Sequence, residues 1–168
     1  KVFTSEANAI EAIKTQQIKK GDIMVLTGCG PLGTGMEETY QVTSALKHLS
    51  YGKYVTLITD ARFSGVSTGA CIGHVGPEGL ADGPIGKIQD GDLIEVRIDA
   101  KNLEGSINFL GTQEREITPE EGARILASRK MYTEIKPSDN LPDDTRLWAA
   151  SQKVSGGTWK GSVSDVDR

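Results

Sequence analysis

The sequence contains few aromatic residues and only two cysteines. Aromatic side chains make up 5% of the 168 residues, so a core has to be built mainly from Val, Ile, Leu and Ala. Cys29 and Cys71 are too few for a disulfide framework and form no C-x-x-C pair. We therefore expect a reduced, cytoplasmic setting for the chain.

Basic clusters and long apolar runs are also missing. No run of Lys or Arg exceeds two residues, and the net charge is −4, which argues against nucleic-acid binding. No apolar stretch approaches the roughly 20 residues that cross a bilayer, and the first residues are not typical of a signal peptide. We expect neither a nucleic acid nor a membrane as partner. Because the chain does not begin with Met, we expect a fragment of a longer protein.

Glycine, in contrast, is abundant and unevenly distributed. Thirteen of the 20 glycines lie between Gly28 and Gly91. They have no three-residue period, which excludes collagen, and Val, Ile and Leu interrupt them, which argues against a flexible linker. The pattern indicates a folded region with tight turns or close backbone approaches.

Hydrophobic periodicity predicts an order of β-α-β followed mostly by strands, which is typical of an α/β sandwich or barrel with flanking helices. The expected helices are 4–16, 37–49 and 118–130, the last with Thr118 as N-cap and Pro119 behind it. The expected strands are 23–26, 54–58, 71–75, 85–88 and 93–98. Residues 89–92 are expected to join the last two strands as a hairpin, and 137–146 to form an extended tail.

The loop Gly28–Gly33 matches G-x-G-x-x-G between a predicted strand and a predicted helix, which is the context of a dinucleotide fingerprint. Pro31, however, removes one N–H from that loop, and Asp60 lies further along the chain than the usual ribose-binding acid. No Lys follows Gly33, so the loop is not a P-loop. A structural turn remains the simpler interpretation.

A third interpretation involves Glu37 and Glu38, which are expected to open the helix after the glycines. Only one of two successive side chains can face inward. An inward carboxylate beside bare backbone would suit Mg²⁺. The alternative is that both acids interact favourably with the helix dipole.

The loop Asp60–Gly69 places three hydroxyls, one acid and one Arg between two predicted strands. Ser64 is followed by Gly65, but there is no G-x-S-x-G elbow, and the only histidines are His48, on an expected helix surface, and His74, expected to be packed. A serine hydroxyl acts as a base only if a metal, an Arg or a helix N-terminus stabilises the alkoxide. That requirement would link Ser64 to the glutamates after the first loop.

Four separated motifs, GPLGTGMEETY, TSAL, LITDARFSG and IGHVGPEGLADGPIGKIQDGDLIEVRID, occur in that order within Val2–Asp99. Together they resemble the C-terminal domain of the dihydroxy-acid, 6-phosphogluconate and sugar-acid dehydratase family. The later segments LEGSINFLGT, LPDDTRLWAA and SGGTWKG resemble the bacterial D-xylonate dehydratase branch in particular. The resemblance implies the fold class α/β. Residues 1–136 are expected to form a swivelling β/β/α domain, which is a mixed β-barrel flanked by helices. Residues 137–168 are then an extension that packs on this domain or on a missing N-terminal domain.

The resemblance also implies the chemistry. The family dehydrates a 2,3-dihydroxy acid to a 2-keto acid with an iron–sulfur cluster and Mg²⁺, whose ligands lie mostly in the N-terminal domain. For this chain the expected reaction is the conversion of a sugar acid, D-xylonate or a related aldonate, to a 2-keto-3-deoxy acid. Neither Cys29 nor Cys71 matches a cluster ligand. Ser64 matches the base that takes the C2 proton, and Glu38 matches a Mg²⁺-binding glutamate. The expected substrate-binding residues are Arg62, Gly65, Val66 and Ser67. Val66 stands where some sugar-acid dehydratases carry Thr, so the hydroxyl that replaces it is left open, as are the roles of Arg62 and His74.

The expected partners are a small sugar acid, the N-terminal domain of the same protein, and further copies of the chain in a dimer or tetramer. By itself the chain is expected to be inactive. The alternative is a non-catalytic swivelling module that binds a partner domain or small ligand through the same glycine loop.

Overall fold

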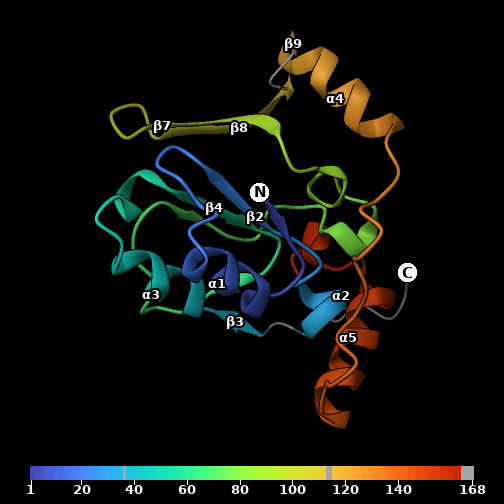
Figure 1. The fold of residues 1–168 in the computed structure, drawn as a ribbon. Coiled ribbons are helices and arrows are strands. Elements are labelled where there is room, and N and C mark those ends of the chain that lie inside the picture. The colour runs from blue at the N-terminus through green and yellow to red at the C-terminus, as the bar shows by residue number, and fades with distance from the viewer. Residues whose placement is uncertain (36, 113–114, 164–168) are drawn as a thin grey trace.

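The computed structural model describes residues 1–35, 37–112 and 115–163, and a four-stranded parallel sheet lies at its centre (Figure 1). Its strands, in spatial order, are β1 (Val2–Phe3), β2 (Ile23–Leu26), β4 (Thr56–Thr59) and β6 (Cys71–Ile72). Strand β2 is apolar, β4 has a Thr on either side of Leu and Ile, and three of the four residues in each are buried, as expected for the middle of a covered parallel sheet.

Helices α1 (Glu6–Lys14) and α3 (Gln41–Lys47) cover one face of this sheet. The Ser5 hydroxyl caps α1 by accepting the Asn8 N–H at 3.2 Å. The 3₁₀ helix η1 (Gly52–Tyr54) follows α3. The core under the helices is aliphatic and includes Ile18, Met24, Leu26, Val42 and Leu57.

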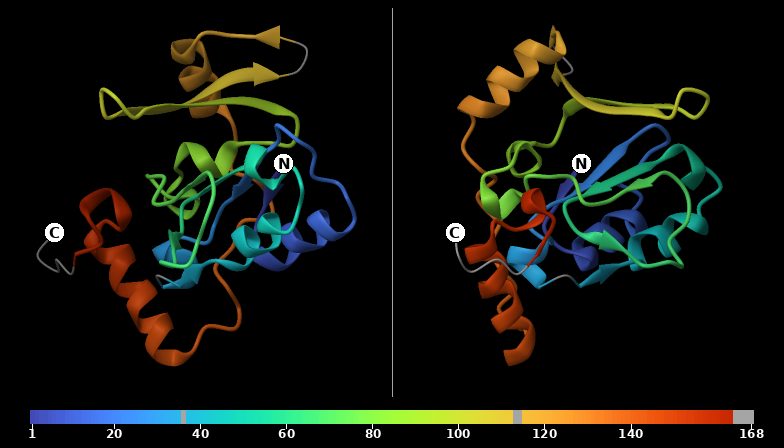
Figure 2. Two further views of the ribbon diagram at one scale, coloured as in Figure 1. Left: turned by 90° about the vertical axis from the view of Figure 1, so that its left-hand side faces the viewer. Right: turned by 180° about the vertical axis from the view of Figure 1, so that it is seen from behind.

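The other face is covered by a second sheet, made of β7 (Asp92–Asp99), β8 (Glu104–Thr112) and β9 (Arg115–Glu116), with α4 (Pro119–Ser128) beside it. Two short 3₁₀ helices, η2 (Gly79–Ala81) and η3 (Pro84–Lys87), lead into β7. Figure 2 shows the resulting order of layers, helices, parallel sheet and antiparallel sheet. This agrees with the expected mixed α/β class, but the described strands form three separate sheets and the predicted barrel is not confirmed.

The remaining elements gather at one end of the parallel sheet. They are α2 (Pro31–Thr34), the paired strands β3 (Glu38–Thr39) and β5 (Arg62–Phe63), α5 (Asp143–Ser155) and η4 (Thr158–Lys160). The loops that start at Thr27 and Asp60 leave the carboxyl ends of the adjacent strands β2 and β4. Such loops meet at one edge of a parallel sheet, where α/β proteins commonly bind ligands.

Several predicted elements are confirmed, among them β2, most of β4, most of β7, α1 and α4, with Thr118 accepting the Glu121 N–H as its cap. The predicted helix 37–49 begins only at Gln41, because Glu38 and Thr39 pair with β5 as a strand. The N-terminal amides of α3 donate to Glu6 Oε1, at 2.9 Å from Gln41 and 3.2 Å from Val42. Glu6, rather than Glu37 or Glu38, therefore supplies the carboxylate at the start of this helix.

Three predictions near the second sheet and the C-terminus are wrong. Pro84 starts the 3₁₀ helix η3, which takes up residues 84–87, so 85–88 is not a strand. Residues 89–92 therefore form no hairpin, and β7 pairs with β8. The end of the predicted tail 137–146 is the first turn of α5. The buried face of α5 consists of Ala149, Gln152 and Ser155, which are small or polar and give no apolar stripe in the sequence.

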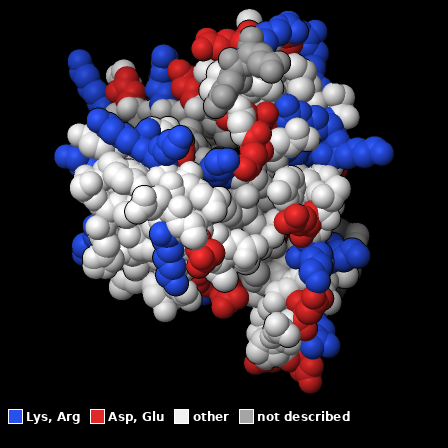
Figure 3. Space-filling model, in the orientation of Figure 1, with Lys and Arg blue, Asp and Glu red and all other residues white. Residues whose placement is uncertain are grey.

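On the face drawn in Figure 3, basic and acidic side chains are interspersed along the upper and right-hand parts, and a large area at the left centre is uncharged. Within the described ranges, no helix is long and apolar enough to span a membrane.

Candidate functional site

A two-residue parallel ladder brings the two predicted site segments together. Its register pairs Glu38 with Arg62 and Thr39 with Phe63. The Arg62 Nη1 atom lies 3.0 Å from Glu38 Oε1. The Ser64 N–H donates to the Thr39 carbonyl at 3.1 Å, so Ser64 continues the ladder by one more bond. The structure thus places Glu38, Arg62 and Ser64 side by side, although 24 or more residues separate Glu38 from the other two.

The ladder presents its charged pair to the surface. Thr39 is 4% exposed, and because neighbouring strand residues point to opposite sides, Glu38 points outward. The Glu38 and Arg62 side chains are 44% and 41% exposed, so their ion pair contributes less than about 1 kcal/mol to stability. A pair held so weakly can exchange its partner for a ligand or for another part of a larger protein.

The loop after Ser64 is a hydrogen-bonded β-turn at the surface. The Ser67 N–H donates to the Ser64 carbonyl at 3.0 Å, and the Ser67 hydroxyl donates to the Thr39 carbonyl at 3.2 Å. A Cβ added at Gly65 would meet no atom within 4 Å. Val66 is 68% exposed. The Ser67 hydroxyl therefore holds the turn against β3, while Gly65 and Val66 leave the space beside Ser64 free.

Asp60, at the end of β4, organises the loops behind this surface. The side chain is completely buried. Its Oδ2 accepts the Gly28 N–H at 2.9 Å and the Gly79 N–H at 2.8 Å, and its Oδ1 accepts the Cys29 N–H at 3.0 Å. Burial raises the pKa of Asp60, and the three N–H donors act in the opposite direction. Sequence reasoning weighed Asp60 only as a ribose ligand and missed this structural role.

Glu78 is a second buried carboxyl, which sequence reasoning did not single out. Glu78 is 1% exposed. Its Oε2 atom accepts a hydrogen bond from the Leu32 N–H at 3.0 Å, and its Oε1 atom accepts one from the Thr158 hydroxyl at 3.4 Å. Burial raises the pKa of Glu78 to about 7, and the charge of Asp60 adds to the effect. Glu78 thus connects the start of α2 with the C-terminal part of the chain.

Replacing Glu78 with Gln is expected to remove a pH dependence of stability. The pKa of Glu78 rises from an ordinary 4.5 to about 7 on folding, so the folded chain binds this proton more tightly than the unfolded chain. Stability from this group is complete below about pH 4.5 and is lost as the pH rises through about 7. Urea unfolding at pH 5 and pH 8 should show the variant gaining roughly 2–3 kcal/mol relative to the wild type at the higher pH. Parallel pH profiles for the two proteins would contradict this assignment.

The glycine-rich loop is packed tightly rather than bare. A Cβ at Gly30 would lie 2.4 Å from Glu78 Oε2, and one at Gly33 would lie 2.0 Å from the Gly28 carbonyl oxygen. The interpretation of the glycines as close backbone approaches is therefore confirmed at these positions. The amides of Gly28 and Cys29 donate to Asp60, and that of Leu32 donates to Glu78. Protein acceptors thus occupy the donors that a bound pyrophosphate would need, which disfavours the dinucleotide interpretation.

Both cysteines lie in surroundings that favour the protonated thiol. Burial raises the pKa of Cys29 to about 12, and its Sγ lies 3.6 Å from the Thr4 carbonyl. Burial also raises the pKa of Cys71. Cluster ligands are thiolates, whose formation these shifts disfavour. Within the described ranges, no three His, Cys, Asp or Glu side chains gather as a metal site.

Glu38 is suited to be one ligand of a Mg²⁺ ion. Glu38 offers an outward carboxylate oxygen of the kind that Mg²⁺ binds, so it suits a site completed by groups from elsewhere. Asp60 is buried and its oxygens already accept N–H groups. The two histidines, His48 and His74, are both exposed, so the expectation that His74 is packed is wrong.

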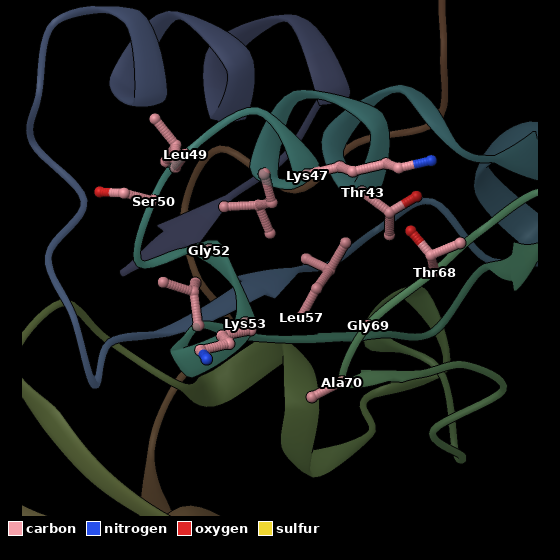
Figure 4. Close-up of a pocket in the computed structure, with 12 residues that line it drawn as sticks. Thr43, Lys47, Leu49, Ser50, Gly52, Lys53, Leu57, Thr68, Gly69 and Ala70 are labelled. Carbon is pink, nitrogen blue, oxygen red and sulfur yellow. The ribbon is translucent and has the colours of Figure 1, made fainter.

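A pocket of about 300 Å³ lies between α3, η1 and residues 68–70, with Leu57 among its lining residues (Figure 4). Its two cationic side chains, Lys47 and Lys53, point to different ends and do not converge on one ligand position. Glu38, Arg62 and Ser64 do not line it. The pocket is therefore separate from the surface formed by β3 and β5.

Comparison with known proteins agrees with the motif resemblance. The family model for the dihydroxy-acid/6-phosphogluconate dehydratase C-terminal region matches residues 1–139. The D-xylonate dehydratases YagF and YjhG of Escherichia coli (strain K12) are 65% and 64% identical over 100% of this chain. A dihydroxy-acid dehydratase of Halothermothrix orenii is 51% identical over 64% of this chain and 20% of its own length.

The chain spans about a quarter (26%) of the length of each of the two D-xylonate dehydratases. The match of the family model over residues 1–139 and the identity over the whole chain lead to one conclusion. This chain belongs to the family of dihydroxy-acid/6-phosphogluconate dehydratase C-terminal regions.

Proposed function

We propose that the chain is the C-terminal part of a hydro-lyase that dehydrates a sugar acid, D-xylonate or a close relative, to a 2-keto-3-deoxy acid. The observation that carries the proposal is the pairing of β3 with β5, which brings Glu38, Arg62 and Ser64 to one exposed edge of the fold. Identity of 65% over the whole chain to a D-xylonate dehydratase supports the choice of substrate class.

In this proposal Ser64 takes the proton from C2 of the substrate. A proton next to a carboxylate is only weakly acidic, so positive charge has to stabilise both the serine alkoxide and the charge that develops on the substrate. Arg62 lies two residues before Ser64, so its guanidinium is a source of positive charge close to the hydroxyl. Gly65, without a side chain, leaves room for the substrate next to the hydroxyl.

Glu38 would hold Mg²⁺ together with ligands from the rest of the protein, and the ion would supply positive charge for the substrate carboxylate and 2-hydroxyl. When it is released by Arg62, the Glu38 carboxylate is free to bind the cation. Neither Cys29 nor Cys71 matches a cluster ligand of the family, so we assign the iron–sulfur cluster to the N-terminal part. Residues 1–136 would form the domain that closes over the site, and 137–168 an extension packed on it.

The test is an anaerobic assay of the full-length protein with a panel of C5 and C6 sugar acids. We expect 2-keto-3-deoxy acid from D-xylonate, and we expect the 168-residue chain purified alone to be colourless and inactive. An active, brown preparation of the isolated chain would contradict the division of the site between two parts. A full-length protein that converts no sugar acid would favour the alternative of a non-catalytic binding module.

A further inference from the structure

The C-terminal segment, residues 135–160, packs along the entire glycine-rich loop, residues 28–35. A Cβ at Gly28 would lie 2.8 Å from Ile135 Cγ2, and the Ser138 N–H donates to the Gly33 carbonyl at 2.9 Å. A Cβ at Gly35 would lie 2.7 Å from both the Cγ2 and the carbonyl oxygen of Thr145. Figure 1 shows α5 against α2 at this end of the fold. The approach of the C-terminal segment therefore requires glycine at 28 and 35, and the Ser138 bond to Gly33 adds a third point of contact.

A fourth contact fixes the far end of the segment. The Thr158 hydroxyl donates to Glu78 Oε1, while Glu78 Oε2 accepts the Leu32 N–H of the loop. Gly157 passes close by, since a Cβ there would lie 3.3 Å from Glu78 Oε1. Glu78 is thus a buried bridge between η4 and the first turn of α2.

The family model covers only the first part of the C-terminal segment, whereas the two D-xylonate dehydratases match all of it. The family model ends at residue 139, whereas α5 begins at Asp143. Both D-xylonate dehydratases match the whole chain, α5 and η4 included. The part that reaches Gly35 and Glu78 thus lies beyond the family model and is shared with relatives named for a polyhydroxylated acid.

We propose that the C-terminal segment is a specificity element, which fixes the glycine-rich loop, and Glu38 three residues after it, in the position that suits a polyhydroxylated acid. Glu78 and Thr158 are its positioning residues and touch no substrate. The proposal rests on the dehydratase function proposed above. A specificity element differs from a segment that only stabilises the fold. If the glycine-rich loop is held in the wrong position, the preference between substrates changes even though the protein stays folded.

The test uses Thr158→Val in the full-length protein, which removes the hydroxyl and keeps the shape of the side chain. Thr158→Ser, which restores a hydroxyl, is the rescue variant. Thr133→Val is the matched control, because Thr133 is exposed in the connection between α4 and α5. The measurement is kcat/KM for D-xylonate and for a 2,3-dihydroxy acid with an apolar chain.

In Thr158→Val we expect the preference for D-xylonate to fall about tenfold, mainly through a higher KM, with Thr158→Ser and Thr133→Val close to wild type. Amide hydrogen exchange over residues 28–35 should become faster in Thr158→Val alone. An unchanged ratio between the substrates, or unchanged exchange, would overturn the specificity role while leaving the dehydratase assignment intact. A wild-type protein that dehydrates neither acid would instead contradict the proposed function.

Discussion

Ser64→Ala in the full-length protein is expected to lower kcat for D-xylonate by about 10²–10⁴-fold, the range that a positioned general base contributes. The Ser64 main chain donates to Thr39, and this bond survives the substitution because it uses the backbone. The turn and the ion pair between Glu38 and Arg62 should therefore stay in place. The loss of activity would then report the missing hydroxyl rather than a displaced loop.

Two further serine variants separate the chemistry from the fold. Ser67→Ala removes a hydroxyl that donates to the Thr39 carbonyl, so we expect a looser turn and a smaller loss of activity than for Ser64→Ala. Ser106→Ala changes an exposed serine on β8, remote from β3 and β5, and should leave kcat unchanged. Activity of Ser64→Ala within a few-fold of the Ser106→Ala control would remove Ser64 from the mechanism.

Asp60→Asn is expected to be the most destabilising conservative change, lowering the free energy of unfolding by about 3 kcal/mol. The wild-type carboxylate accepts N–H groups on both oxygens, two on Oδ2 and one on Oδ1. An Asn side chain has only one oxygen, so in either orientation its NH₂ group faces at least one buried N–H. The loop of Gly28 and Cys29 and the loop of Gly79 would then lose hydrogen bonds to the carboxylate that they share.

Urea unfolding of the chain measures this loss directly. Asp99→Asn is the control, since Asp99 also accepts two backbone N–H groups, from Lys101 and Asn102, in an exposed turn where water can replace it. We expect little change in the urea midpoint for Asp99→Asn and a large decrease for Asp60→Asn. Equal midpoints for the two variants would show that Asp60 is not the anchor of the glycine loops.

Local sequence signals were sufficient for some elements and not for others. The Thr118 cap and Pro119 define the start of α4 within the sequence itself, and the apolar run of β2 requires burial wherever it lies. Strand β3, in contrast, exists only because β5 lies beside it. Nothing in residues 37–40 signals that pairing, and two acids before a polar-apolar pattern favour a helix start instead.

The candidate site divides in the same way. The motif resemblance selected Glu38, Arg62 and Ser64, and the structure brings these three together, while their roles stay predictions. Asp60 and Glu78 were missed because their role depends on burial and on backbone donors far away in the chain. An acid that ends a buried strand next to glycine-rich loops is a sequence signal that could have identified Asp60.

The most direct test of the central claim is an NMR assay of D-xylonate conversion in D₂O by the full-length protein and its Ser64→Ala variant. Removal of the C2 proton and loss of the 3-hydroxyl leave an enol, which takes a solvent deuteron at C3 as it becomes the keto acid. The account predicts a C3-deuterated 2-keto-3-deoxy acid from the wild type and almost none from Ser64→Ala. The same product at the same rate from both proteins would contradict it.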